Sequence, residues 1–117
     1  MAQRYCQALD LVNDPEKIRT YIRHHQAIWP EIRTHIVDCG IADMQIWRLG
    51  TRLFMIMETN DSYDAAAAAA KAALDPKVQA WEALMWQFQV ATPWAREGEK
   101  WVAMEKIFDL QQQLPQP

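Results

Sequence analysis

Three prolines constrain the fold of this chain, because each falls where a helix must begin or break. Pro15 and Pro76 each follow an aspartate, and an acidic cap before a proline in the first turn is typical of a helix start. Pro30 instead interrupts helix-forming sequence, so the helix should kink or restart within residues 27–31. The prolines therefore predict two helical regions, and the first of them is broken.

Apolar residues in both regions recur at steps of three and four, which is the spacing of a helix face that packs on a core. The first stripe consists of Ile18, Ile22, His25, Trp29, Ile32 and Ile36, and the second of Val78, Trp81, Leu84, Met85 and Phe88. A run of alanines, Ala65–Ala70, adds a helix before the second stripe, with capping chemistry supplied by Asn60, Asp61 and Ser62.

The remaining patterned segments read as strands. Residues 3–12 are rich in strand-forming side chains, and residues 41–49 and 52–59 form a hairpin joined at Gly50-Thr51. Gly40 ends the preceding helix. Residues 92–99 are expected to be a loop and Lys100–Leu110 a last strand.

The element order is therefore β-α-β-β-α-β, the α+β ferredoxin-like arrangement of an antiparallel sheet with two helices on one face. We expect one domain over residues 1–110 and a C-terminal tail over residues 111–117, which lacks the apolar content to pack. If strand residues such as Trp47, Phe54, Ile56 and Met57 divide between the two faces of the sheet, the open face has an apolar surface. That surface predicts a homodimer, and a dimeric α+β barrel.

Composition excludes several classes of partner. The formal net charge is −3, and no run of Lys or Arg is present that could neutralise the phosphates of a nucleic acid. Cys6 and Cys39 have neither zinc-ligand nor disulfide-framework spacing, which favours a reducing cytoplasm. No apolar stretch reaches the length of a membrane span, so no membrane partner is expected.

Histidine is the side chain that exchanges protons near neutral pH, and His24 and His25 are adjacent. Neighbouring helical residues point about 100° apart, so only one of them can face a given pocket. His25 lies on the apolar stripe with Tyr21 one turn before it, whereas His24 is expected to face solvent. The alternative is that His25 is a half-buried core residue and Tyr21 its packing neighbour. No ligand set for a metal is apparent.

The six tryptophans of the chain form a second group of candidates. Indole rings pack on the apolar C–H faces of ring ligands such as sugars, although most tryptophans belong to a core. Trp29, Trp81 and Trp86 are our candidate substrate-binding residues. The chain contains no Gly-rich phosphate loop and no nucleophile elbow, which disfavours cofactor-dependent and acyl-transfer chemistry.

The segment from Tyr21 to Ile32, YIRHHQAIWPEI, resembles the signature of the L-rhamnose mutarotase family, in which a tyrosine precedes by four the histidine of H-x-x-[IV]-W-P-E. The similarity extends over nearly the whole chain. It implies a dimeric ferredoxin-like isomerase that interconverts the α and β anomers of a 6-deoxy-L-sugar without metal or cofactor. By the same resemblance His25 and Tyr21 are the catalytic pair, and Trp81 contacts the sugar.

The chain departs from the family pattern at one position. Rhamnose-specific members carry a second tryptophan directly after the first, and this chain has Glu82 there. The segment from Gly98 to Glu105 is similar to a branch associated with L-fucose. The expected substrate is therefore a monosaccharide that is either L-rhamnose or L-fucose.

Two other functions fit the same fold. One is a dimeric α+β-barrel monooxygenase or heme-handling protein, in which His25 takes a different role. The other is a metabolite-binding module without catalysis, in which the tryptophans bind the ligand.

Overall fold

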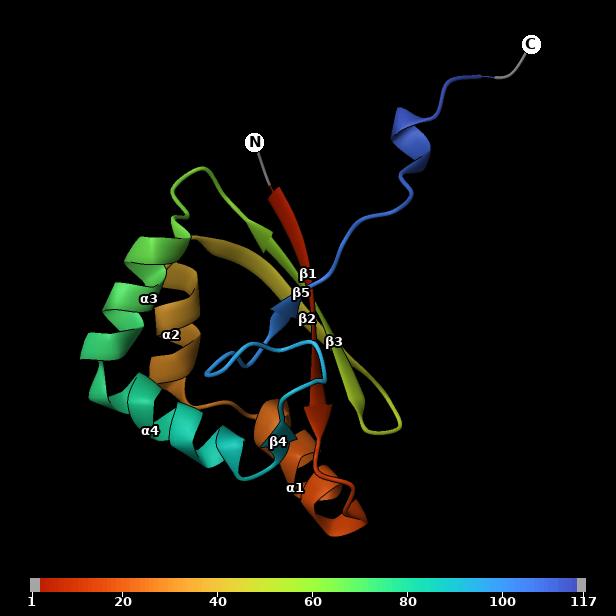
Figure 1. Ribbon diagram of the computed structural model, residues 1–117. Helices are drawn as coiled ribbons and strands as arrows, with labels where there is room; N and C mark the ends of the chain where they lie inside the picture. The colour runs from red at the N-terminus through yellow and green to blue at the C-terminus, as the bar shows by residue number, and fades with distance from the viewer. Residues whose placement is uncertain (1–2, 116–117) are drawn as a thin grey trace.

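The computed structural model describes residues 3–115 and places one antiparallel sheet beside a layer of helices (Figure 1). The elements in chain order are β1 (Gln3–Leu11), α1 (Pro15–Gln26), α2 (Pro30–Asp38), β2 (Ile41–Leu49), β3 (Arg52–Thr59), α3 (Ala65–Leu74), α4 (Pro76–Trp86), β4 (Gln89–Val90), β5 (Val102–Ala103) and the 3₁₀ turn η1 (Leu110–Gln112). The strand order is β2-β3-β1-β4, and β5 also pairs with β1. The α+β ferredoxin-like prediction is confirmed.

Aspartates begin the helices, as the prolines indicate. Asp14 accepts hydrogen bonds from the backbone nitrogens of Glu16 and Lys17, and Asp75 does the same at the start of α4. Such a cap contributes about 0.5–2 kcal/mol to helix stability. The break at Pro30 is complete, so α1 and α2 are separate helices. The expected cap of the alanine helix was wrong, because Asp64 rather than residues 60–62 accepts from Ala67.

Gly40 ends α2 in a conformation that other residues rarely adopt. Its φ is +92°, and a Cβ atom there would lie 2.8 Å from both Asn60 Oδ1 and Ser62 Oγ. The helix stop at Gly40 is thus confirmed, and the chain turns directly into β2.

The C-terminal part of the sheet differs from the prediction. Of the expected strand Lys100–Leu110, only Val102–Ala103 pairs with β1, followed by one more bond from the Met104 nitrogen to the Cys6 carbonyl at 2.8 Å. The outer edge of β1 is shared, because β4 pairs with Asp10 and Leu11 farther along it. Residues 105–115 leave the sheet and extend away from the domain (Figure 1).

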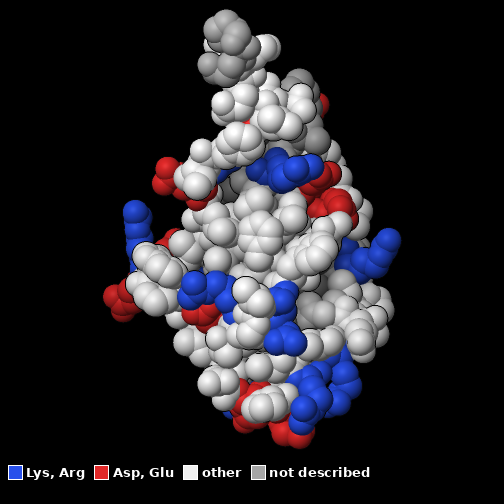
Figure 2. All heavy atoms as spheres, turned by 90° about the vertical axis from the view of Figure 1, so that its right-hand side faces the viewer, with Lys and Arg blue, Asp and Glu red and all other residues white. Residues whose placement is uncertain are grey.

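The sheet has two unlike faces. Alternate residues of β1 and β3 that point to the helices are buried, and they include Leu9, Leu11, Leu53 and Met55. Helices α1, α2 and α4 contribute Tyr21, Ile32, Val78, Trp81 and Met85 to the same core. The other face carries no helix, and its uncharged centre is bordered by charged side chains (Figure 2).

Candidate functional site

A cavity of about 940 Å³ lies between the sheet and the helices. Its wall combines apolar side chains with polar ones, as the walls of small-molecule sites do. The residues on it that can exchange protons or form hydrogen bonds include Tyr21, His25, Glu82, Gln89 and Lys100. Trp81 and Trp101 supply aromatic surface to the same cavity. These residues come from α1, α4, β4 and the segment that enters β5.

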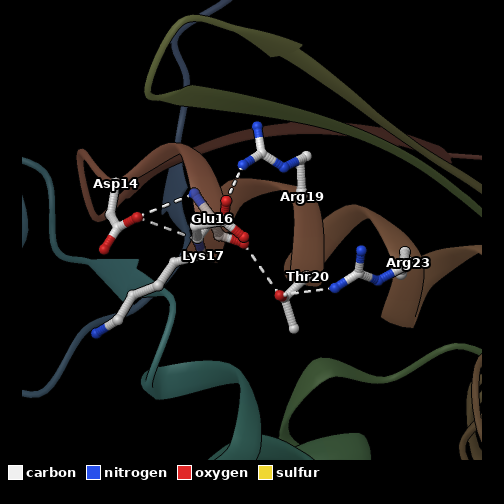
Figure 3. Close-up of polar contacts among 6 residues, drawn as sticks. All are labelled: Asp14, Glu16, Lys17, Arg19, Thr20 and Arg23. Carbon is white, nitrogen blue, oxygen red and sulfur yellow. Dashed lines mark hydrogen bonds and ion pairs between the residues drawn. The ribbon is translucent and has the colours of Figure 1, made fainter.

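Helix α1 is held by polar contacts on the side that faces solvent (Figure 3). The Glu16 carboxylate forms an ion pair with Arg19, and its carbonyl accepts from the Thr20 hydroxyl at 3.0 Å. Arg23 in turn donates to Thr20 Oγ1 at 3.1 Å. These bonds occupy one face of the helix, and Tyr21 and His25 lie on the opposite face, which borders the cavity.

Tyr21 is almost completely buried, with 3% of its surface exposed, yet its hydroxyl has a partner. Gln89 Nε2 donates to Tyr21 Oη at 3.1 Å. Burial raises the pKa of Tyr21 to about 12; the bond from Gln89 opposes that rise and the charge of Glu82 adds to it. Tyr21 is therefore protonated at neutral pH and can donate its proton.

His25 follows one turn later and packs on Tyr21, with ring centroids 4.3 Å apart. Its Nδ1 lies 2.9 Å from the Tyr21 carbonyl oxygen. A carbonyl can only accept, so Nδ1 carries the proton, and Nε2 keeps a free lone pair when the ring is neutral. Burial lowers the pKa of His25 below 6.5; the Tyr21 carbonyl opposes this shift and His24 adds to it. Neutral His25 is a proton acceptor at pH 7.

The three candidate tryptophans occupy different places. Trp81 lines the cavity, and its ring centroid is 5.7 Å from that of His25. Trp29 packs against Trp81 at 5.1 Å and does not line the cavity itself. Trp86 lies partly exposed, and Lys100 Nζ is 4.7 Å from its ring centroid. The structure thus brings Tyr21, His25 and Trp81 together and places Trp29 and Trp86 behind or outside the cavity wall.

His24 is not the solvent-facing residue that the sequence indicated. It is half-buried and packs on the rings of Phe88, at 5.6 Å, and Trp81, at 6.3 Å. The reason is that Trp81 of α4 and Phe88, which precedes β4, cover this side of α1. His25 alone of the two lines the cavity, as the helical geometry predicts.

Glu82 and Lys100 form an ion pair on the cavity wall, with Lys100 Nζ 2.5 Å from Glu82 Oε2. The lysine side chain is mostly buried, with 12% of it exposed. Sequence reasoning did not assign Gln89, Lys100 or Trp101 to the site. No local pattern in the sequence distinguishes Trp101, which precedes β5, or Gln89 as a cavity residue.

Within residues 3–115, no group of three or more His, Cys, Asp or Glu side chains is arranged to hold a metal ion. In the same part of the chain, no helix has the length and apolar character needed to cross a membrane.

Comparisons with known proteins show similarity over nearly the whole chain. The family model for L-rhamnose mutarotase matches residues 4–110. An L-fucose mutarotase of Xanthomonas campestris pv. campestris is 47% identical over 110 residues, which cover 92% of this chain and 88% of the relative. A UPF0734 protein of Dictyostelium discoideum is 39% identical over 110 residues, covering 91% and 88%.

Solved structures share the fold at low sequence identity. An L-rhamnose mutarotase from Formosa agariphila superposes with a TM-score of 0.69 at 18% identity, covering 92% of this chain and 98% of that one. Tetracenomycin F2 cyclase from Streptomyces glaucescens, a type-II polyketide cyclase, gives 0.61 at 18% identity, with 92% and 95% covered. The architecture alone thus accommodates different chemistries. The family match and the identity to curated relatives decide among them: the chain belongs to the L-rhamnose mutarotase family, isomerases that act on sugar anomers.

Proposed function

We propose that this chain interconverts the α and β anomers of a 6-deoxy-L-sugar, with L-fucose as the preferred substrate. The 47% identity to an L-fucose mutarotase supports this sugar. So does Glu82, which stands beside Trp81 where rhamnose-specific members are expected to carry a second tryptophan. L-Fucose and L-rhamnose differ in the orientation of hydroxyls at C2 and C4. A charged hydrogen-bonding pair on the wall is a means of distinguishing them.

His25 and Tyr21 are the proposed catalytic pair. His25 Nε2 removes the proton of the anomeric hydroxyl, while the Tyr21 hydroxyl protonates the ring oxygen as the bond from C1 to that oxygen breaks. The open aldehyde rotates about the C1–C2 bond and recloses on its other face, with the two proton transfers reversed. No redox change occurs and no group leaves. General acid–base assistance of this kind contributes about 10²–10⁴-fold to rate.

One observation carries the assignment of roles: the hydrogen bond between His25 Nδ1 and the Tyr21 carbonyl. It fixes the tautomer whose Nε2 is free to accept a proton, and it holds that ring against the side chain that supplies the acid. Trp81, next to His25, offers its indole to the apolar face of the pyranose.

The proposed assembly is a homodimer formed through the open face of the sheet. That face exposes Trp47, at 61%, which lies opposite Phe54 and near Ile56. The cross-strand ion pairs Arg4–Glu58 and Arg52–Asp10 lie on the same face. An apolar centre within a charged rim is typical of a protein interface. We place the enzyme in the cytoplasm, because Cys6 and Cys39 are both free thiols.

Saturation-exchange proton NMR on the anomeric resonances tests the activity directly. L-Fucose and L-rhamnose are each measured with and without protein at matched pH, because free sugars also exchange anomers slowly. Faster exchange for both, with L-fucose ahead, supports the proposal. Acceleration of L-rhamnose alone overturns the sugar assignment, and no acceleration of either overturns the activity.

Family membership favours a mutarotase over the oxygenase and binding-module alternatives. A Soret absorbance band in purified protein would instead point to heme. Sugar-dependent quenching of tryptophan fluorescence without anomer exchange would point to a binding module.

A further inference from the structure

Gln89 is a buried polar residue in the cavity wall that the roles of His25 and Tyr21 leave unexplained. It exposes 6% of its surface and lies opposite Leu11 in the pairing of β1 with β4. Residues directly opposite one another in an antiparallel pair share a face of the sheet, and Leu11 points into the core. Pairing with β1 therefore directs the Gln89 side chain toward the helices and the cavity.

The two ends of the Gln89 amide have different surroundings. Nε2 donates to Tyr21 Oη at 3.1 Å. Oε1 is buried and has no hydrogen-bond partner among residues 3–115. A buried acceptor without a partner is costly, and such atoms occur where a ligand or water completes the bonding. Gln89 lines the cavity, so a hydroxyl of a bound ligand is a suitable donor.

The bond to Tyr21 also determines what the phenol can do. A tyrosine oxygen that accepts a hydrogen bond from Gln89 keeps its own proton available for a second partner. The ring of Tyr21 is held between His25, at 4.3 Å, and Phe88, at 6.1 Å, so the hydroxyl is fixed in place as well as in hydrogen-bonding role.

We propose that Gln89 is the positioning residue of this site: its amide nitrogen orients the Tyr21 hydroxyl as a proton donor, and its amide oxygen accepts a hydrogen bond from a hydroxyl of the sugar. The inference rests on the proposed function, because it assigns Tyr21 as the acid. It adds a residue that bridges the acid and the substrate. The bond from Gln89 also lowers the pKa of Tyr21 against the effect of burial, which makes the phenol a stronger acid.

The main test is a double-mutant cycle with Gln89→Met and Tyr21→Phe, because methionine keeps the length of the side chain without its hydrogen bonds. Anomer exchange of L-fucose is measured for the wild type, both single variants and the double variant. We expect Gln89→Met to lower kcat at least about tenfold in the wild-type background and by less than threefold when Tyr21 is already phenylalanine. Equal losses in both backgrounds, or an unchanged rate, would overturn the role.

A second readout separates positioning from packing. Titration of the phenol by ultraviolet difference absorbance should show a higher pKa for Tyr21 in Gln89→Met than in the wild type, with Tyr21→Phe identifying the signal. An unchanged titration would contradict the hydrogen bond as the cause. If Gln89→Met does not fold, Gln89→Glu serves in its place. Its carboxylate accepts a hydrogen bond from the Tyr21 hydroxyl, which then no longer points its proton at the sugar. Exchange should therefore fall at neutral pH, and full activity would overturn the proposal.

The amide oxygen is tested with methyl α-L-fucopyranoside, whose ring cannot open. Binding is followed by tryptophan fluorescence, because Trp81 lines the cavity. Gln89→Met should weaken binding about tenfold, which is the loss expected of one good hydrogen bond. Equal affinity of the two proteins would show that Gln89 does not bond to the sugar. Wild-type exchange is the dividing control: its absence overturns the proposed function, whereas active wild type with an equally active Gln89→Met overturns this inference alone.

Discussion

The two faces of the sheet are formed by the same strands but differ in what they contact: one packs on the helices and borders the cavity, and the other is exposed. On the helix side, residues such as Leu53 and Met55 are buried, and the polar side chains that line the cavity include Tyr21, Gln89 and Lys100. On the open side, Trp47 is exposed and charges pair across neighbouring strands, as Arg4 does with Glu58. Strand alternation produces this division, because successive side chains point to opposite faces. Chemistry is therefore expected on one face and association on the other, and substitutions should separate the two.

The largest effect is expected on the cavity face at His25. His25→Ala removes the proposed base, so anomer exchange of L-fucose should fall about 10²-fold or more with folding largely intact. Saturation-exchange NMR measures the rate, and circular dichroism checks the fold.

His24→Ala is the matched control for that variant. His24 packs on Phe88 and Trp81 outside the cavity, so exchange should change little. If His24→Ala lost as much activity as His25→Ala, the choice of His25 as the base would be wrong. Unchanged exchange in His25→Ala would show that His25 takes no part in the reaction.

A smaller effect is expected at the Glu82–Lys100 pair, which concerns sugar choice rather than chemistry. Glu82→Gln keeps the shape but removes the charge that Lys100 contacts at 2.5 Å. We expect the ratio of kcat/KM for L-fucose to that for L-rhamnose to fall about tenfold, because a wall built to bond a hydroxyl loses discrimination when its partner changes. Exchange assays on both sugars measure the ratio, and a ratio equal to that of the wild type would contradict this role for Glu82.

The site could be predicted only in part, because the sequence indicates which residues are neighbours within one helix but not how the helices pack on one another. Tyr21 and His25 are one helical turn apart, so helix geometry alone predicts that they are neighbours. Trp29 and Trp86 illustrate the limit. Periodicity indicates which face of a helix is apolar, but only the packing of α1, α2 and α4 decides that Trp81 reaches the cavity while Trp29 lies behind it.

The fold shows the same division between local and distant information. Helix starts depend on adjacent capping residues and were predicted from Asp14 and Asp75. Strands β4 and β5 exist because backbone atoms of β1, about 80–95 residues earlier in the chain, are available to pair with them. The two residues Gln89–Val90 are too few to show the alternating pattern of a strand. The sequence of Lys100–Leu110 suggests a long strand, but only Val102–Ala103 pairs with β1.

Substitutions on the open face of the sheet should weaken dimer formation and have less effect on the rate of anomer exchange. Trp47→Lys places a charge in the proposed interface, and burying it without a partner opposes dimer formation. Light scattering should show about half the wild-type mass. Leu74→Lys is the control, because Leu74 is a similarly exposed apolar residue on α3, away from this face. Loss of the dimer in Leu74→Lys, or a wild-type mass in Trp47→Lys, would contradict an interface through the open face.

The smallest effect returns to the cavity face and concerns pH. His25 acts as a base only when neutral, and burial lowers its pKa below 6.5. Exchange should therefore fall to half where the pH equals the pKa of His25, and that midpoint should lie below pH 6.5. A midpoint at or above 6.5 in the rate profile would contradict the shift.

Stability changes in the same direction. Between the lowered folded-state pKa of His25 and its ordinary value of 6.5, the unfolded chain binds more protons than the folded one. The free energy of unfolding therefore decreases as the pH falls through this window and is constant below it, as far as His25 is concerned. Urea unfolding of the wild type and His25→Gln across this range isolates the effect, because glutamine does not titrate. Parallel pH dependences for the two proteins would show that burial of the neutral imidazole contributes nothing to it.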